Sequence, residues 1–479
     1  MNRITLVAVL LFSMAFRGVA KEGYHINLKI TPATNDSVVY LVQYYGKPLP
    51  TIYKRDSAKL DKKGNAVFDS KDPDFIGGIY MMLLSDRKTY FEFLLDKGSD
   101  ITINADLTKL PLGVTFKNSP ENEHFQDYVV FLKDYSVRQQ DLQKEYAAAR
   151  NAEDTAAVRK KSVQASKDLA KYRREQAEKY KGTLLSGIFH SLEVPIVPEG
   201  EHMLADGKTR DSAFAYKYYK SHYWESYNLK DDRLIHTPIY DAKLEEYFNK
   251  LVLPWPDSMI KESNELLSKT RGTKETFKYT LWWLTRNAEN SKIMGMDEVF
   301  VYLVENYYMK GDATWLSSEE LNKYIDRAMK IAPNVIGNLA PEVRLPNLTT
   351  GKYESLASFK AKYTLLVFYA PTCGHCKEEM PAIDSVYKSL LKGKGMRVYA
   401  VSTEGDEAAA KDFIKKYKLD DWTTTWDPEH VSDWRSKFDV YSTPTIYLLD
   451  EKKIIRGKRL DHNNIASLVE MLERKEKNK

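Results

Sequence analysis

The chain has only two cysteines, Cys373 and Cys376, among its 479 residues. Two residues separate them, and they follow directly on an apolar run at 363–370 and a short Pro-Thr turn. The run has the length and composition of a buried strand, and the residues after the turn favour a helix. The cysteine pair is therefore expected where a buried strand ends and a helix begins.

Strand and helix patterns alternate from residue 335 to the end of the chain. Strands are expected at 363–370, 397–402, 445–449 and 453–460, and helices at 376–391, 407–417, 428–438 and 462–474. Alternating elements of this length are typical of an α/β sheet. Residues 335–479 are therefore expected to form one α/β domain.

Two other patterns precede this region, so the protein is expected to be multidomain. Residues 21–118 contain short alternating runs separated by turns, such as the turn at 61–65, which is typical of a β-sandwich-like domain. Residues 119–334 are rich in helix formers and predict an all-α domain. Within it, the charged segment 138–181 favours a helical hairpin, because its apolar residues hold no heptad.

The first twenty residues (1–20) have the features of a secretory signal peptide. Arg3 opens a short positive region, residues 4–16 are mostly apolar, and Gly18 and Ala20 supply small residues before a cleavage site at Lys21. No later stretch approaches the roughly 18 apolar residues of a membrane helix. We therefore expect a soluble mature protein that is exported to the periplasm.

The charges argue against two classes of partner. The chain has 72 Lys and Arg against 67 Asp and Glu, a net charge of +5. Nucleic-acid-binding proteins concentrate a basic excess, and membrane-surface proteins carry a polybasic block, but neither occurs here.

A zinc site needs three or four ligands, and the other histidines are scattered without paired spacing. No nucleic acid, metal or cofactor is expected.

One close pair of cysteines in an exported chain points to redox chemistry. The thiolate is the nucleophile in disulfide exchange, and the N–H groups and dipole at a helix N-terminus stabilise it on Cys373. Cys376, one turn later, can attack a mixed disulfide on Cys373. His375 adds positive charge beside the thiolate, which lowers the pKa of Cys373 further. We therefore expect these three residues to be catalytic.

Residues from about 337 to 475 resemble the thioredoxin-fold domain of the TlpA/ResA-like family of exported thiol–disulfide oxidoreductases. The resemblance rests on the Ala-Pro-Glu-Val-Arg-Leu-Pro segment at 340–346, the strand followed by C-G-H-C, Pro381 in the next helix, and Ser-Thr-Pro-Thr at 442–445. The layout of the whole chain looks like multidomain exported thioredoxin-like proteins of Gram-negative bacteria.

The resemblance implies roles for individual residues. Cys373 and Cys376 would form the redox-active disulfide, and Pro444 would be a cis-proline in a loop that faces the cysteines. The backbone of Thr443 would pair with a strand of the client protein. Glu379 matches an acidic residue near the active site of the family and is the candidate for proton relay.

Two positions depart from the family pattern. Thr372 stands where the family usually has Trp, and Val367 stands where thioredoxin has a buried aspartate, so another group must handle protons. C-G-H-C is also the active-site sequence of protein disulfide isomerases, which leaves open whether clients are reduced, oxidised or isomerised. Residues 404–427 are expected to supply the extra helix and strand of the TlpA/ResA group.

These observations predict an exported thiol–disulfide oxidoreductase that exchanges electrons with client proteins and with a membrane electron donor or acceptor. Two alternatives remain. In the first, residues 21–334 bind a surface partner or peptide, on which the redox module acts locally. The second is a peroxiredoxin-type peroxidase, but that chemistry requires Thr three residues before the cysteine, where this chain has Ala370.

Overall fold

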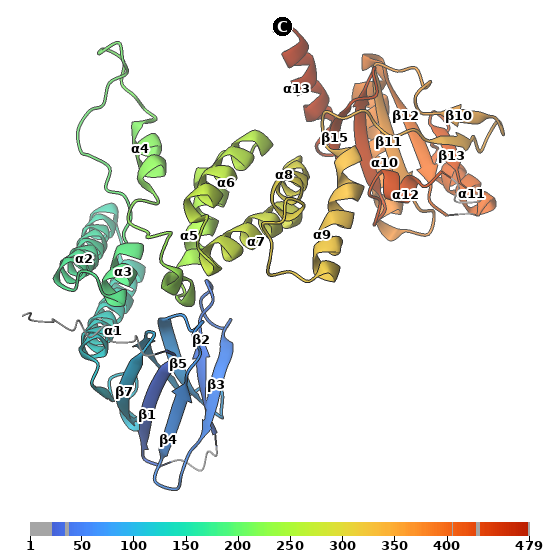
Figure 1. The fold of residues 1–479 in the computed structure, drawn as a ribbon. Helices are drawn as coiled ribbons and strands as arrows, with labels where there is room; N and C mark the ends of the chain where they lie inside the picture. Colours follow the sequence, from blue (N-terminus) through green and yellow to red (C-terminus); the bar gives the residue numbers. More distant parts are fainter. Residues whose placement is uncertain (1–21, 34–37, 405, 428–431, 478–479) are drawn as a thin grey trace, which may run out of the picture. The chain divides into compact units, whose positions relative to one another are not determined.

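The computed structural model describes residues 22–33, 38–404, 406–427 and 432–477, and the expected signal peptide lies outside them (Figure 1). The chain divides into two compact units. The first consists of residues 1–247 and 273–276, and the second of residues 248–272 and 277–479. The boundaries expected at 118 and 334 remain predictions. No helix in the described ranges is long and apolar enough to cross a membrane.

Two four-stranded sheets form the β-rich part of the first unit, as the sequence predicts. Their strand orders are β4-β1-β7-β8 and β3-β2-β5-β6. Buried and more exposed residues alternate along β1, because successive side chains of a strand point to opposite faces. Apolar side chains of both sheets meet in one buried cluster. The strands are β1 (Tyr24–Thr31), β2 (Val38–Gln43), β3 (Tyr53–Lys59), β4 (Asn65–Ser70), β5 (Gly78–Leu84), β6 (Tyr90–Leu95), β7 (Ser99–Asp106) and β8 (Val114–Lys117).

Helices follow the sheets in the first unit, and the predicted hairpin is confirmed. Asn151 begins its second helix as an N-cap, because its side chain accepts a hydrogen bond from the backbone N–H of Asp154. Leu142, Val158 and Ala165 form a small apolar cluster between the two helices of the hairpin. The helices are α1 (Pro120–Ala148), α2 (Ala152–Lys179), α3 (Leu184–Ser191), α4 (Phe214–His222) and α5 (Tyr240–Glu246).

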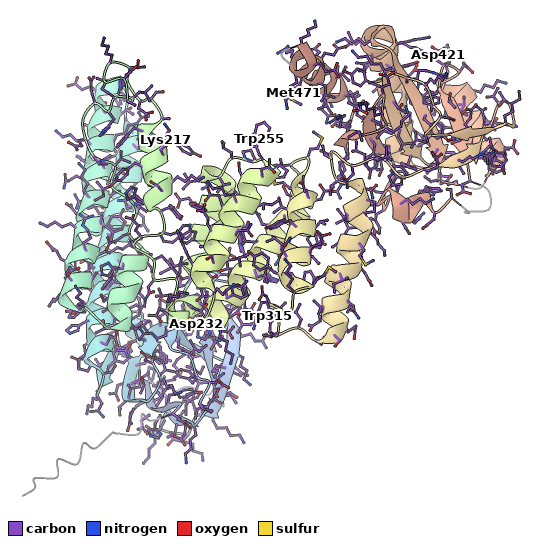
Figure 2. The ribbon with its side chains drawn as sticks, turned by 45° about the horizontal axis from the view of Figure 1, so that its top comes forward. Lys217, Asp232, Trp255, Trp315, Asp421 and Met471 are labelled. Carbon is purple, nitrogen blue, oxygen red and sulfur yellow. The ribbon has the colours of Figure 1, made fainter. Side chains whose placement is uncertain are left out.

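Further helices precede the α/β region of the second unit. Ser317 and Glu320 form a capping box at the start of α9, in which each side chain binds the backbone N–H of the other residue. Trp315, labelled in Figure 2, precedes α9 and packs edge-on against Phe277 of α7, with 6.3 Å between ring centroids. The helices are α6 (Pro256–Thr270), α7 (Glu275–Asn290), α8 (Met296–Leu303) and α9 (Ser318–Ile331).

A five-stranded sheet of order β13-β12-β11-β14-β15 forms the core of the α/β region. Its central strand β11 is buried along its whole length, parallel to β12 and antiparallel to β14. Alternate residues of β11 enter two different apolar clusters, one of which includes the inner face of α10. The elements are β9 (Arg344–Pro346), β10 (Tyr353–Ser355), β11 (Tyr363–Tyr369), α10 (Gly374–Val386), β12 (Met396–Ser402), α11 (Glu407–Tyr417), β13 (Thr423–Trp426), α12 (Trp434–Lys437), β14 (Thr445–Asp450), β15 (Ile455–Lys458) and α13 (Ile465–Lys477).

The coarse organisation predicted from the sequence is confirmed, with a β-rich start, a helical middle and an α/β end. The elements α11 and β13 are the extra helix and strand expected within 404–427. The helix expected at 428–438 is shorter in its described part, where α12 begins only at Trp434. Asp433 has a left-handed backbone with φ of 50°, which does not continue a right-handed helix. Residues 428–431 lie outside the described ranges.

Candidate active site

Cys373 and Cys376 lie at the junction of β11 and α10, as the sequence predicts. Cys373 is the N-cap residue of α10, and the backbone N–H of Lys377 donates to its carbonyl. The Cys373 side chain is partly exposed, whereas Cys376 is completely buried, and both are free thiols. A molecule in solution can therefore reach the sulfur of Cys373 but not that of Cys376.

The two thiols have opposite pKa shifts. Partial burial raises the pKa of Cys373, but hydrogen bonds from the Thr443 side chain and from the backbone N–H groups of Cys376 and His375 outweigh it, so the pKa lies below its ordinary value. Burial raises the pKa of Cys376 to about 12, and the neighbouring Cys373 adds to the rise. Cys373 therefore ionises at a lower pH than Cys376, and a thiolate is more reactive than a thiol.

The loop at 442–445 faces the exposed thiol. The Sγ of Cys373 donates a hydrogen bond to the carbonyl oxygen of Thr443 at 3.2 Å, and the peptide bond between Thr443 and Pro444 is cis. The structure thus brings together residues separated by 70 positions in the sequence, at the start of β14.

His375 lies in the first turn of α10 with its side chain exposed. Its backbone N–H is one of the groups that lower the pKa of Cys373. A charged imidazole at this exposed position interacts with the thiolate through solvent, which weakens the interaction.

Glu379 lies on α10, one turn after Cys376, and its carboxylate is held by His462. The backbone N–H of His462 donates to Oε1 of Glu379 at 2.6 Å, and Nδ1 of the ring lies 2.8 Å from Oε2. The sequence pattern did not single out His462, because it lies 83 residues away in a turn before α13. No pattern in the neighbouring sequence marks His462 as the partner of Glu379.

Two further residues at the site, Tyr369 and Glu404, were not predicted from the sequence. Tyr369 ends β11 and is buried in the same apolar cluster as Cys376. Burial raises the pKa of its hydroxyl, and Cys376 contributes to the rise. Glu404 accepts hydrogen bonds from the hydroxyl and the backbone N–H of Thr372, the residue before Cys373. Val367 is fully buried, and as a valine it has no group that could transfer a proton.

Three family models match consecutive parts of the chain. The AhpC/TSA family matches residues 336–458, and two domains of unknown function, DUF4369 and DUF5106, match residues 24–125 and 150–334. The two cysteines, Glu379 and the Thr443-Pro444 loop lie within the AhpC/TSA match, whereas His462 lies four residues beyond its end.

Two curated relatives each match about a quarter of the chain. Thioredoxin-like protein YneN of Bacillus subtilis is 33% identical over 121 residues, which are 25% of this chain and 68% of YneN. Thiol-disulfide oxidoreductase ResA of Oceanobacillus iheyensis is 33% identical over 132 residues, 26% of this chain and 65% of ResA. The chain thus spans about two thirds of the length of these curated relatives. A solved domain of a possible thiol-disulfide isomerase from Cytophaga hutchinsonii is 32% identical, with a TM-score of 0.28, and covers 31% of this chain and 99% of that domain.

Proposed function

Because the chain belongs to the thioredoxin-like family of thiol–disulfide oxidoreductases, we propose that its C-G-H-C dithiol exchanges electrons with the cysteines of client proteins outside the cytoplasm. The observation that carries the proposal is the contact between Cys373 and the Thr443 carbonyl. It places the more acidic and more exposed thiol against the loop whose backbone we expect to pair with a client strand.

In the reductive direction, the Cys373 thiolate attacks one sulfur of a client disulfide. A mixed disulfide forms, and the second client sulfur leaves as a thiolate. Cys376 then loses its proton and attacks the Cys373 sulfur, which releases the first client sulfur and leaves a Cys373–Cys376 disulfide. The client gains two electrons and two protons, and the dithiol loses them. Every step is reversible, so the same residues oxidise a client dithiol when the disulfide is the starting state.

The neighbouring residues support separate parts of this exchange. Thr443 and Pro444 position the client, and His375 stabilises the Cys373 thiolate. Glu379 lies one turn beyond Cys376 and relays its proton, with His462 fixing the direction of the carboxylate. A membrane electron donor or acceptor restores the dithiol after each turnover, and the signal peptide directs the protein to the periplasm.

A trapping experiment tests this function. In the cell that makes the protein, Cys376→Ser is expected to accumulate mixed disulfides between Cys373 and client proteins, because the resolving sulfur is absent. These adducts disappear on reduction and are absent from the double variant Cys373→Ser/Cys376→Ser. If Cys376→Ser traps nothing that the double variant does not trap, the proposal is wrong.

The reduction potential of the dithiol decides the direction of electron flow. A value near roughly −270 mV, as in thioredoxin, means that the protein reduces its clients. A value between about −180 and −120 mV means that it forms or rearranges disulfides. Equilibration of the full chain in glutathione buffers measures this potential.

The site favours disulfide exchange over the alternative of a peroxiredoxin-type peroxidase. Position 370 is alanine, so the threonine hydroxyl that the peroxidase motif places three residues before its cysteine is missing. We expect the reduced protein to consume hydrogen peroxide no faster than an ordinary thiol of similar pKa. Rapid peroxide consumption that requires Cys373 would instead establish a peroxidase.

A further inference from the structure

The segment that leads into the Thr443-Pro444 loop is bound by a helix from outside the α/β region. Nη1 of Arg327, on α9, lies 2.5 Å from Oδ1 of Asp439, and its guanidinium lies over the ring of Tyr441, 5.1 Å from the ring centroid. All three residues belong to the second compact unit. One arginine thus contacts the chain two and four residues before Thr443.

Asp439 is the anchor of this contact. Its side chain is only 3% exposed, and a buried carboxylate is costly unless a cation pairs with it. Arg327 supplies that cation at the shorter distance, while Arg459 lies 3.8 Å away. The backbone of Asp439 is left-handed, with φ of 50°, so the chain changes direction here. The ion pair therefore holds the turn from which the client-binding loop departs.

Tyr441, in contrast to buried Asp439, is exposed to solvent. It is 63% exposed, an unusual position for a large ring, and the guanidinium of Arg327 lies over one of its faces. Only Ser442 separates it from Thr443 along the chain, a span of at most about 7 Å between the two Cα atoms. A cation over the ring restricts its motion and leaves the remaining surface available to another molecule.

We propose that Tyr441 is a client-binding residue and that Arg327 positions the Tyr441 ring. Tyr441 then favours client proteins with an aromatic or large aliphatic side chain close to the reacting cysteine. The inference rests on the proposed function, because it assigns the client that the Cys373 site selects. A ring whose orientation is already restricted loses little conformational entropy when a client packs on it. Aromatic pairs also gain from specific ring geometry beyond the area they bury.

Two synthetic peptides test the proposal on the reduced full chain. Each has one cysteine in a disulfide with 2-nitro-5-thiobenzoate, and they differ in having Phe or Gly two residues before the cysteine. Cys373 attacks the peptide sulfur and releases the coloured thiobenzoate, and Cys376 then releases the peptide thiol and leaves the Cys373–Cys376 disulfide. The third probe is the symmetric disulfide of two 2-nitro-5-thiobenzoate molecules, which contains no peptide.

The wild-type protein is expected to react about fivefold faster with the Phe peptide than with the Gly peptide. Tyr441→Ala lowers the rate with the Phe peptide to the rate with the Gly peptide and so removes the preference, whereas Tyr441→Phe retains it. Arg327→Gln reduces the preference about twofold to threefold without abolishing the reaction. Lys323→Ala is the matched control on the same helix, because Lys323 pairs with exposed Glu319 and should change none of the rates.

The inference is overturned if the wild-type protein reacts equally fast with both peptides, or if Tyr441→Ala slows all three probes by one factor. Tyr441→Phe guards against a folding defect, because it keeps the ring. A protein that reacts with the free thiobenzoate disulfide and both peptides without preference disproves the role of Tyr441 alone. A protein that reacts with none of the three probes disproves the proposed function itself.

Discussion

Glu379 on α10 and His462, in the turn before α13, are joined by two hydrogen bonds, one from the backbone and one involving the ring of His462. The pair connects the helix that carries the cysteines to the segment that follows the last strand of the sheet. The carboxylate that we propose for proton relay is therefore held in one orientation by a residue 83 positions away.

We expect His462→Ala to lower the free energy of unfolding by about 1 kcal/mol, because a charged hydrogen bond at a partly exposed position is lost. The same variant should slow the release of a mixed disulfide by Cys376 if Glu379 must be correctly oriented to accept its proton. Urea denaturation and single-turnover kinetics measure the two effects. Asn463→Ala is a matched control in the same exposed turn. Unchanged kinetics in both His462→Ala and Glu379→Gln would contradict the proton relay.

The pKa shifts predict how the two thiols respond to pH. In Cys376→Ser, the rate of alkylation of Cys373 by iodoacetamide should reach half its maximum below pH 9.0, the ordinary value, because the folded protein stabilises the thiolate. In Cys373→Ser, Cys376 should stay almost unreactive until the pH approaches about 12. Equal alkylation profiles for the two variants would show that the environments of the sulfurs are not distinct.

The same pKa shifts predict how the stability of the reduced protein changes with pH. Cys376 titrates near 9.0 in the unfolded chain and near 12 in the folded protein, so the unfolded state loses its proton first as the pH rises. This group therefore lowers the free energy of unfolding of the reduced protein as the pH rises from about 9 to 12. Cys373 has the opposite shift, so above its folded-state pKa its ionisation favours the folded reduced protein.

His375→Pro should make the dithiol more reducing. The substitution removes both the imidazole and the backbone N–H that stabilises the Cys373 thiolate, and loss of that stabilisation disfavours the reduced form. A shift of roughly 30 mV would correspond to about 1.4 kcal/mol. His375→Ala keeps the N–H, so the difference between the two variants isolates the backbone contribution. An unchanged potential in both variants would exclude a tuning role for position 375.

The sequence predicted the local parts of the site and missed those that depend on the fold. The strand, the cysteines and the opening of α10 are adjacent in the chain, so the hydrophobic pattern and the motif were sufficient to place them. The partners of Thr372 and Glu379 come from segments 32 and 83 residues away. Their identity follows from how the strands and helices pack, and a scattered histidine or glutamate has no distinguishing pattern before that packing is known.

The same limit applies to the helices before the α/β region. The change in composition near residue 334 predicted a boundary, yet Arg327 and Asp297 from those helices form ion pairs with residues of the α/β region. A charged residue on a helix is most often solvated, so these partners could not be expected from the sequence pattern. They appear only when the buried acceptors, such as Asp439, are located in the structure.

The ion pair between Lys458 of β15 and Asp297 of α8 should be the most sensitive of these contacts to substitution. Both side chains are largely buried, and the ammonium also donates to the carbonyl of Asn334 at 2.9 Å. Burial lowers the pKa of Lys458 and the Asp297 carboxylate opposes that effect, so each charge depends on the other. Lys458→Met leaves the Asp297 carboxylate buried without its cation, and we expect a loss of about 3 kcal/mol in the unfolding free energy of the second unit.

Urea denaturation of the full chain, with tryptophan fluorescence as the signal, measures this loss. The double variant Lys458→Met/Asp297→Leu should recover most of it, because two apolar side chains carry no desolvation penalty. Lys452→Met replaces an exposed lysine at the turn before β15 and should change stability by less than about 0.5 kcal/mol. If Lys458→Met is as stable as Lys452→Met, the ion pair does not hold α8 against β15, and the contact contributes nothing to the stability of the unit.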